Sequence, residues 1–169
     1  RRDFTINGMF YDILGDRVID YVSGQKDLSR RVVRAIGRPE ERFQEDHLRM
    51  LRAVRFAARL GFDVNTKTSH AIKENAAYIK NISAERVMTE LEKVLIDPNR
   101  MRGIDLAIRY NLLEHILPSV SEPQIRSGHG TLEQLPATCS LSLAMAALLV
   151  KCHADEAANI CRALKSNNH

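Results

Sequence analysis

The sequence contains no tryptophan and is poor in aromatic residues, which make up only 5% of its 169 residues. Hydrophobic residues nevertheless make up 44% of the chain, which is enough to build a core. That core must be packed mainly by Leu, Ile, Val and Ala, a composition that fits packing between helices.

The sequence also lacks a hydrophobic run long enough to cross a bilayer. The longest apolar run, LSLAMAALLV at residues 141–150, is about half the length that a membrane span requires. It predicts a buried helix, and we expect no membrane partner. No signal peptide is visible, and because the chain starts at Arg1 rather than at Met, we expect it to be a fragment of a longer protein.

Zinc-binding cysteine patterns are absent as well. The three cysteines, Cys139, Cys152 and Cys161, have spacings that match no zinc site. Because their neighbours are apolar, we expect buried free thiols in a reducing compartment, the cytoplasm.

The excess of positive charge is small. The chain has 25 Lys and Arg against 21 Asp and Glu, which gives a net charge of +4 and a pI near 9.1. This balance is a mild indication of a polyanionic partner, although many unrelated proteins are equally basic.

The first forty residues differ in kind from the rest. Two short β-branched runs, GDRVIDYV and RRVVRAI, flank a predicted helical turn at GQKDLSRR, which is typical of the end of an α/β unit. From Glu45 onward the hydrophobic periodicity is helical. Beyond residue 62 we predict helices over residues 68–80, 83–96, 99–113, 141–150 and 154–165. Between Pro118 and Pro136, prolines and glycines interrupt the periodicity, so we predict a long loop there.

Residues 45–62, EDHLRMLRAVRFAARLGF, predict a helix that opens with two carboxylates and carries four arginines. At about 100° per residue, Asp46 and Arg49 fall inside its apolar arc, one turn apart. A charged pair facing a core is costly unless both partners are satisfied, which indicates groups positioned for a ligand. Arg52 and Arg55 fall on one flank, a strip suited to phosphates, whereas Arg59 is better explained as part of a solvated face.

Three stretches together resemble the family of class II tRNA nucleotidyltransferases and bacterial poly(A) polymerases. RRDFTINGMFYD resembles the family's motif of an arginine pair, an aspartate and an asparagine, and residues 45–62 resemble its nucleotide-reading helix. SAERVMTELEKVL is similar to the helix that follows, with Arg86 and Glu90 in the expected places, and GQKDL lies where the family has Gly-x-x-Asp-Leu. The order and spacing also agree, and the resemblance covers roughly residues 1–118.

The resemblance implies roles for individual residues. Asp46 and Arg49 would read the base edge of incoming CTP or ATP, because these enzymes use no nucleic-acid template. The other residues that would contact the nucleotide are Arg2, Asp3, Asn7, Arg52 and Arg55.

Two structural alternatives stay open at this point. Arg2, Asp3 and Asn7 could instead belong to a short helix that is capped and charged there. Arg86 and Glu90 could form an ion pair at i and i+4, worth ~0.3–0.5 kcal/mol, although we favour a role in bracing the reading helix.

The fold implied is mainly α. Residues 1–40 would be the C-terminal remnant of an α/β nucleotidyltransferase head with at most two or three short strands, residues 41–118 a helical neck, and residues 119–169 the start of a body domain. The family's Asp-x-Asp pair, which holds the catalytic Mg²⁺, would lie upstream of Arg1. We therefore expect the Mg²⁺ ligands outside this chain, and the 169 residues alone to be inactive.

The function implied is template-independent addition of C and/or A to tRNA 3′ ends, with RNA, CTP and ATP as partners. A poly(A) polymerase acting on RNA 3′ ends is the closest alternative, because it shares these motifs. A helical RNA-binding fragment without catalytic activity is a third possibility from another class.

Overall fold

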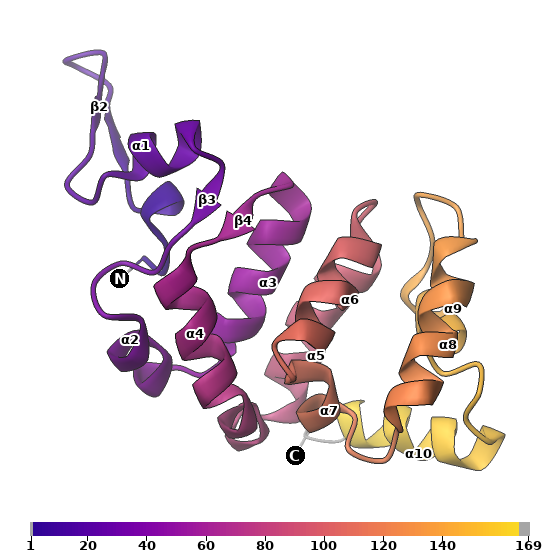
Figure 1. The fold of residues 1–169 in the computed structure, drawn as a ribbon. Helices are drawn as coiled ribbons and strands as arrows, with labels where there is room; N and C mark the ends of the chain where they lie inside the picture. Colours follow the sequence, from indigo (N-terminus) through magenta and orange to yellow (C-terminus); the bar gives the residue numbers. More distant parts are fainter. Residues whose placement is uncertain (1, 166–169) are drawn as a thin grey trace.

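The computed structural model describes residues 2–165 and confirms a mainly helical chain. Its helices stand in a row, and a small part with short strands lies at the N-terminal end of that row (Figure 1). Among the described residues, the only sheets are two pairs of short strands.

The N-terminal part is built around a short hairpin and one helix. A 3₁₀ turn, η1 (Thr5–Asn7), leads into β1 (Phe10–Asp12), which pairs antiparallel with β2 (Arg17–Ile19). Helix α1 (Gly24–Ser29) and β3 (Val32–Val33) follow. β2, α1 and β3 lie within the predicted segments, whereas β1 was not predicted. The hairpin projects away from the row of helices (Figure 1).

The next segment contains the predicted arginine-rich helix. Helix α2 (Pro39–Glu45) precedes α3 (Leu48–Leu60), and β4 (Asp63–Val64) then pairs in parallel with β3. Gly61 ends α3 in the left-handed region, with φ of 65°, where a residue without Cβ is favoured. Helix α4 (Thr66–Asn75) continues into the 3₁₀ helix η2 (Ala76–Asn81).

Helix α5 (Ala84–Leu95), predicted over residues 83–96, presents an apolar face to the core. Val87, Leu91, Val94 and Leu95 are all buried, which confirms the helical period. The single helix predicted over residues 99–113 is wrong, because the chain forms α6 (Arg100–Arg109) and α7 (Leu112–Ile116). Asn111 separates them with φ of 60°, a conformation that Asn tolerates better than most residues.

The loop predicted between Pro118 and Pro136 is also wrong. Residues Glu122–Glu133 form helix α8, and a capping box closes its first turn, in which the backbone N–H of Ser121 donates to Oε1 of Gln124 at 2.9 Å. Pro123 lies in that turn, where a missing N–H costs nothing. Gly128 allows α8 to approach the backbone of Leu148, since a Cβ there would lie 2.0 Å from the Leu148 oxygen.

Two more helices, α9 (Leu141–Leu148) and α10 (Ala154–Lys165), complete the described chain and confirm the predicted buried helix. Cys139, Cys152 and Cys161 are free and half-buried, rather than fully buried as expected. None of the helices in residues 2–165 is both long and apolar enough to cross a membrane.

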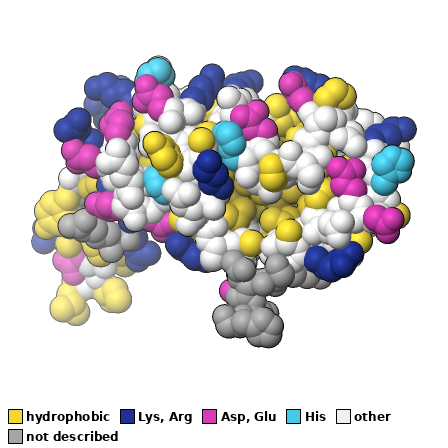
Figure 2. All heavy atoms as spheres, turned by 90° about the horizontal axis from the view of Figure 1, so that it is seen from below, with side chains coloured by type: hydrophobic (Ala, Val, Ile, Leu, Met, Phe, Trp, Pro, Cys, Tyr) yellow, Lys and Arg dark blue, Asp and Glu magenta, His cyan; other side chains and the backbone are white. Residues whose placement is uncertain are grey.

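The core centres on α3, which packs against α5 and α6. Met50, Leu51, Ala53 and Val54 are fully buried, whereas Leu60 is 43% exposed at the end of the helix. The lower face of the molecule has hydrophobic side chains gathered in its middle, with charged side chains around them (Figure 2).

Candidate functional site

Several of the residues singled out by sequence lie where α2 ends and α3 begins. Asp46 is not part of the helix, because its backbone is extended, with φ of −159° and ψ of 103°. One carboxylate oxygen accepts from the Leu48 N–H at 3.1 Å, and the other accepts from Arg86 Nη2 at 2.8 Å. Asp46 therefore caps the first turn of α3 and connects it to α5.

Arg49 lies in the first turn of α3 and its side chain is only 13% exposed. Its Nη1 donates to the Arg42 carbonyl oxygen and to Oε2 of Glu45, both at 2.7 Å, and its Nε lies 3.2 Å from Oδ1 of Asp3. The inward placement expected from the helical wheel is confirmed. The arrangement as two residues one turn apart in a helix is wrong, because Asp46 precedes the helix and is bonded to Arg86.

Arg52 and Arg55 are both paired with carboxylates of other segments. Arg52 Nε donates to Oδ2 of Asp3 at 2.7 Å, and Arg52 Nη1 lies 3.3 Å from Oε1 of Glu90. Arg55 Nε lies 2.8 Å from Oε2 of Glu90, and the guanidinium stands 4.5 Å from the centre of the Phe56 ring. The physical reason is Glu90, whose carboxylate is buried and requires cations around it.

Glu90 also lies 3.0 Å from Lys93, so three cations surround one carboxylate that is 3% exposed. Together with the Arg86–Asp46 contact, this places α5 as a support for the start and middle of α3. The interpretation of Arg86 and Glu90 as braces therefore agrees with their contacts. The alternative, an ion pair between Arg86 and Glu90, is not among the described ion pairs, in which Arg86 is paired with Asp46 and Glu90 with Arg52 and Arg55. Arg59 is exposed and has no ion pair within residues 2–165, as expected of a solvated position.

The first motif supplies Asp3 to this cluster. Asp3 lies between Arg49 and Arg52 and joins η1 to α3. Asn7 Oδ1 accepts from the Phe4 N–H at 3.0 Å, so its side chain closes η1, as the capping interpretation anticipates. Arg2 is exposed, and its carbonyl oxygen accepts from Arg42 Nη2 at 2.8 Å.

Arg42 is a residue of the cluster that the sequence interpretation missed. Its side chain is only 11% exposed, and it contacts Glu45 in addition to the Arg2 carbonyl. The spacing Arg42, Glu45, Arg49 at three and four residues is a signal that could have indicated it. That spacing would normally be assigned to a surface ion pair.

A second network of hydrogen bonds connects η1 to α1. Asp27, in α1, is 3% exposed and accepts from Thr5 Oγ1 at 2.7 Å and from Arg34 Nε at 2.8 Å. Burial by itself would raise the pKa of Asp27, but the hydrogen bonds from Arg34 and Thr5 outweigh it and lower that pKa below its ordinary value. Gly24 completes the contact, since a Cβ there would lie 2.3 Å from the Thr5 carbonyl oxygen.

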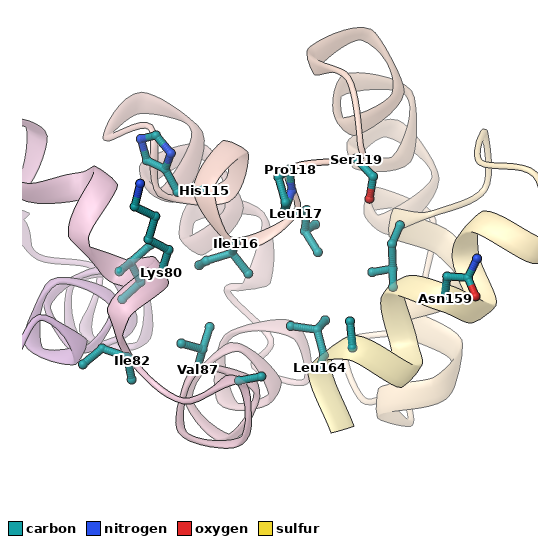
Figure 3. Close-up of a pocket in the computed structure, with 14 residues that line it drawn as sticks. Lys80, Ile82, Val87, His115, Ile116, Leu117, Pro118, Ser119, Asn159 and Leu164 are labelled. Atoms are coloured by element: carbon teal, nitrogen blue, oxygen red, sulfur yellow. The ribbon is translucent and has the colours of Figure 1, made fainter. Parts of the chain in front are cut away.

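Two apolar hollows lie elsewhere in the described chain. One of about 380 Å³ lies between η2, α5, α7 and α10, with Ile82, Val87 and Leu164 along it and Lys80 and His115 at one end (Figure 3). Within residues 2–165 no group of three or more His, Cys, Asp or Glu side chains is placed to hold a metal ion.

Two family models match the chain. The model described as the poly A polymerase head domain matches residues 1–34, and the model described as the probable RNA and SrmB-binding site of polymerase A matches residues 61–122.

Individual relatives agree with these matches. The CCA-adding enzyme of Lactobacillus helveticus is 33% identical over 168 residues, which are 99% of this chain and 42% of the relative. Poly(A) polymerase I of Escherichia coli O6:H1 is 38% identical over 135 residues, which are 80% of this chain and 29% of the relative.

A solved structure of the Bacillus stearothermophilus CCA-adding enzyme in complex with CTP superposes with a TM-score of 0.63 at 29% identity. The match covers 98% of this chain and 45% of that one. The chain thus spans less than half the length of these proteins. With two family models, the relatives and the fold in agreement, the chain belongs to the family of CCA-adding enzymes and bacterial poly(A) polymerases.

Proposed function

We propose that the protein containing this chain adds C and/or A to tRNA 3′ ends without a template, and that Asp46 and Arg49 read the incoming base. Relatives named CCA-adding enzymes, and the related enzyme solved with CTP, support the reaction. The observation that carries the role of the pair is that Asp46 and Arg49 are each held by other residues, within one cluster.

Both side chains keep hydrogen-bonding capacity. Each Asp46 oxygen accepts one described hydrogen bond and has a second lone pair. Arg49 donates through Nη1 and faces Asp3 through Nε, and a guanidinium carries five N–H donors in all. A carboxylate can accept from an exocyclic amino group, and a guanidinium can donate to a ring acceptor. Cytosine and adenine present both groups side by side.

The rest of the cluster would set the charge at the nucleotide. Five cations, Arg42, Arg49, Arg52, Arg55 and Lys93, lie against three carboxylates, those of Asp3, Glu45 and Glu90. This excess favours a triphosphate nearby. We propose that Arg52 and Arg55 serve its phosphates while Asp3 and Glu90 hold their side chains, and that Arg2, Asp3 and Asn7 contact the nucleotide from η1.

The reaction needs carboxylates for Mg²⁺ that the described residues do not supply, so we place the metal ligands outside this chain. We also propose the division into residues 1–40, 41–118 and 119–169. The two family models, which match residues 1–34 and 61–122, support its first two parts. Three free thiols fit a reducing compartment such as the cytoplasm.

The products formed on a tRNA that lacks its terminal CCA test this proposal. We expect the full-length protein to extend that tRNA with C from CTP and to add A once the Cs are present. Failure to extend it with either nucleotide contradicts the proposal.

The relationship to E. coli poly(A) polymerase I favours one alternative, a poly(A) polymerase. The same assay separates the two functions. Long A tracts from ATP alone, with no use of CTP, indicate the polymerase.

A further inference from the structure

A basic pocket lies on α1, outside the cluster at Asp46 and Arg49. Its volume is about 340 Å³, and it is lined by Val22, Ser23, Lys26, Asp27, Arg30 and Arg34. Three of these six side chains are cationic, and one is an acid. We propose that this α1 pocket binds backbone phosphates of the RNA substrate. The proposal deepens the proposed function and rests on it for the identity of the polyanion.

The single acid of the pocket is already neutralised. Asp27 is buried and makes two hydrogen bonds with Arg34, through Nε at 2.8 Å and Nη2 at 3.1 Å. The nearby Asp20 is occupied too, because its carboxylate accepts from the Gly24 and Gln25 N–H groups at 2.9 and 3.0 Å. Lys26 and Arg30 therefore give the pocket a positive charge that no carboxylate in it balances.

Lys26 and Arg30 are free to meet a ligand. Both are exposed, and neither makes an ion pair with another residue of the described chain. They lie one helical turn apart at the end of α1, so both can point into the same hollow. Arg34 differs from them, because Asp27 fixes its guanidinium and leaves 38% of the side chain exposed.

The place of the pocket favours RNA over the nucleotide. In Figure 1, α1 lies at the upper left beside the hairpin, whereas α2, which leads to Asp46, lies at the lower left. A nucleotide held by Asp46 and Arg49 would have its phosphates near Arg52 and Arg55. A second phosphate site apart from that cluster suits a ligand with many phosphates, which is the RNA strand.

The test is the salt dependence of RNA binding by the full-length protein, with a tRNA lacking its terminal CCA as the probe. In the double variant Lys26→Gln/Arg30→Gln, two phosphate contacts are lost. The slope of log K against log salt should then fall by about 1.4 to 1.8, and affinity at about 0.15 M salt should drop roughly ten- to thirtyfold. Gln is polar and uncharged, and both positions are exposed, so the midpoint of thermal unfolding should not change.

A matched control removes the same charge elsewhere. Lys151 and Arg162 are exposed and lie outside both ranges matched by the family models. Lys151→Gln/Arg162→Gln should leave the slope within about 0.5 of the unmodified protein. An equal fall in this control means that only net charge matters and overturns the proposal.

Two further results also overturn it. One is an unchanged salt slope in Lys26→Gln/Arg30→Gln. The other is a raised KM for CTP and ATP with unchanged RNA affinity, which would assign the pocket to the triphosphate. In either case an unchanged preference for CTP and ATP over UTP and GTP leaves the proposed function standing, so the two failures are distinguishable.

Discussion

The substitution Glu90→Gln probes the support that α5 gives to α3. Glu90 is 3% exposed and lies within 3.3 Å of Arg52, 2.8 Å of Arg55 and 3.0 Å of Lys93. Arg55 Nε and Glu90 Oε2 are buried and make no aligned hydrogen bond, so this contact depends on charge. Loss of the carboxylate leaves the Arg55 charge, on a side chain only 12% exposed, without its partner.

Removing one partner of a buried ion pair costs about 3–5 kcal/mol, and we expect about 3 kcal/mol because Gln keeps the volume and one acceptor. For a chain of this size, that corresponds to a fall of roughly 6–12 °C in the unfolding midpoint. Thermal unfolding followed by circular dichroism measures it. Glu85→Gln, at an exposed position on the same helix, is the control and should change the free energy of unfolding by less than about 0.5 kcal/mol. If Glu90→Gln shifts the midpoint no more than Glu85→Gln does, the bracing role is refuted.

Three other predictions concern buried residues that connect neighbouring segments. Asp27 has a folded-state pKa below its ordinary value. Its carboxylate therefore contributes stability above about pH 4, and this contribution is lost as the pH falls through the folded-state pKa. In Asp27→Asn the free energy of unfolding should fall less steeply with pH in this acid limb of the stability profile. An unchanged acid limb would contradict this. Gly24→Ala should lower the free energy of unfolding by about 1–3 kcal/mol in urea unfolding, because the new Cβ would meet the Thr5 carbonyl oxygen. The control Gly130→Ala, at a position with open space around it, should not lower that free energy. Arg100 is 3% exposed and donates to the Leu95 and Pro136 carbonyl oxygens. Arg100→Met should therefore leave buried acceptors unpaired and lower the free energy of unfolding by roughly 1–3 kcal/mol in urea unfolding. A change near zero would show that water replaces the guanidinium.

Helices with a regular apolar period were predictable from sequence. The apolar faces of α4 and α5 follow the 3.6-residue period, and residues on them such as Ile72 and Leu91 are buried. Helix α8 was missed because Pro123, Gly128 and Gly130 read as interruptions. Pro123 lies in the first turn of α8 and Gly128 allows contact with Leu148, so neither residue prevents a helix.

The sequence motifs indicated residues that lie near the start of α3, but not the contacts that these residues make. Sequence motifs pointed to Asp3, Asp46, Arg49 and Arg52, and the structure brings them together at the start of α3. A helical wheel assumes that the helix continues, so it could not show that Asp46 leaves the helix to cap it. It also could not show contacts between distant segments, such as that of Arg52 with Asp3, which is 49 residues away.

The choice among nucleotides tests the central claim, that Asp46 and Arg49 read the base. The measurement is kcat/KM for CTP, ATP, UTP and GTP on one tRNA primer, in the full-length protein and its variants Asp46→Ala and Arg52→Ala. A charge-assisted hydrogen bond is worth ~1.5–3 kcal/mol, so Asp46→Ala should reduce the preference for CTP and ATP by roughly tenfold to a hundredfold. Arg52→Ala should lower all four values about equally, because every nucleotide carries the same phosphates. If Asp46→Ala lowers all four values alike and leaves their ratios unchanged, Asp46 only caps α3 and the account of base selection is contradicted.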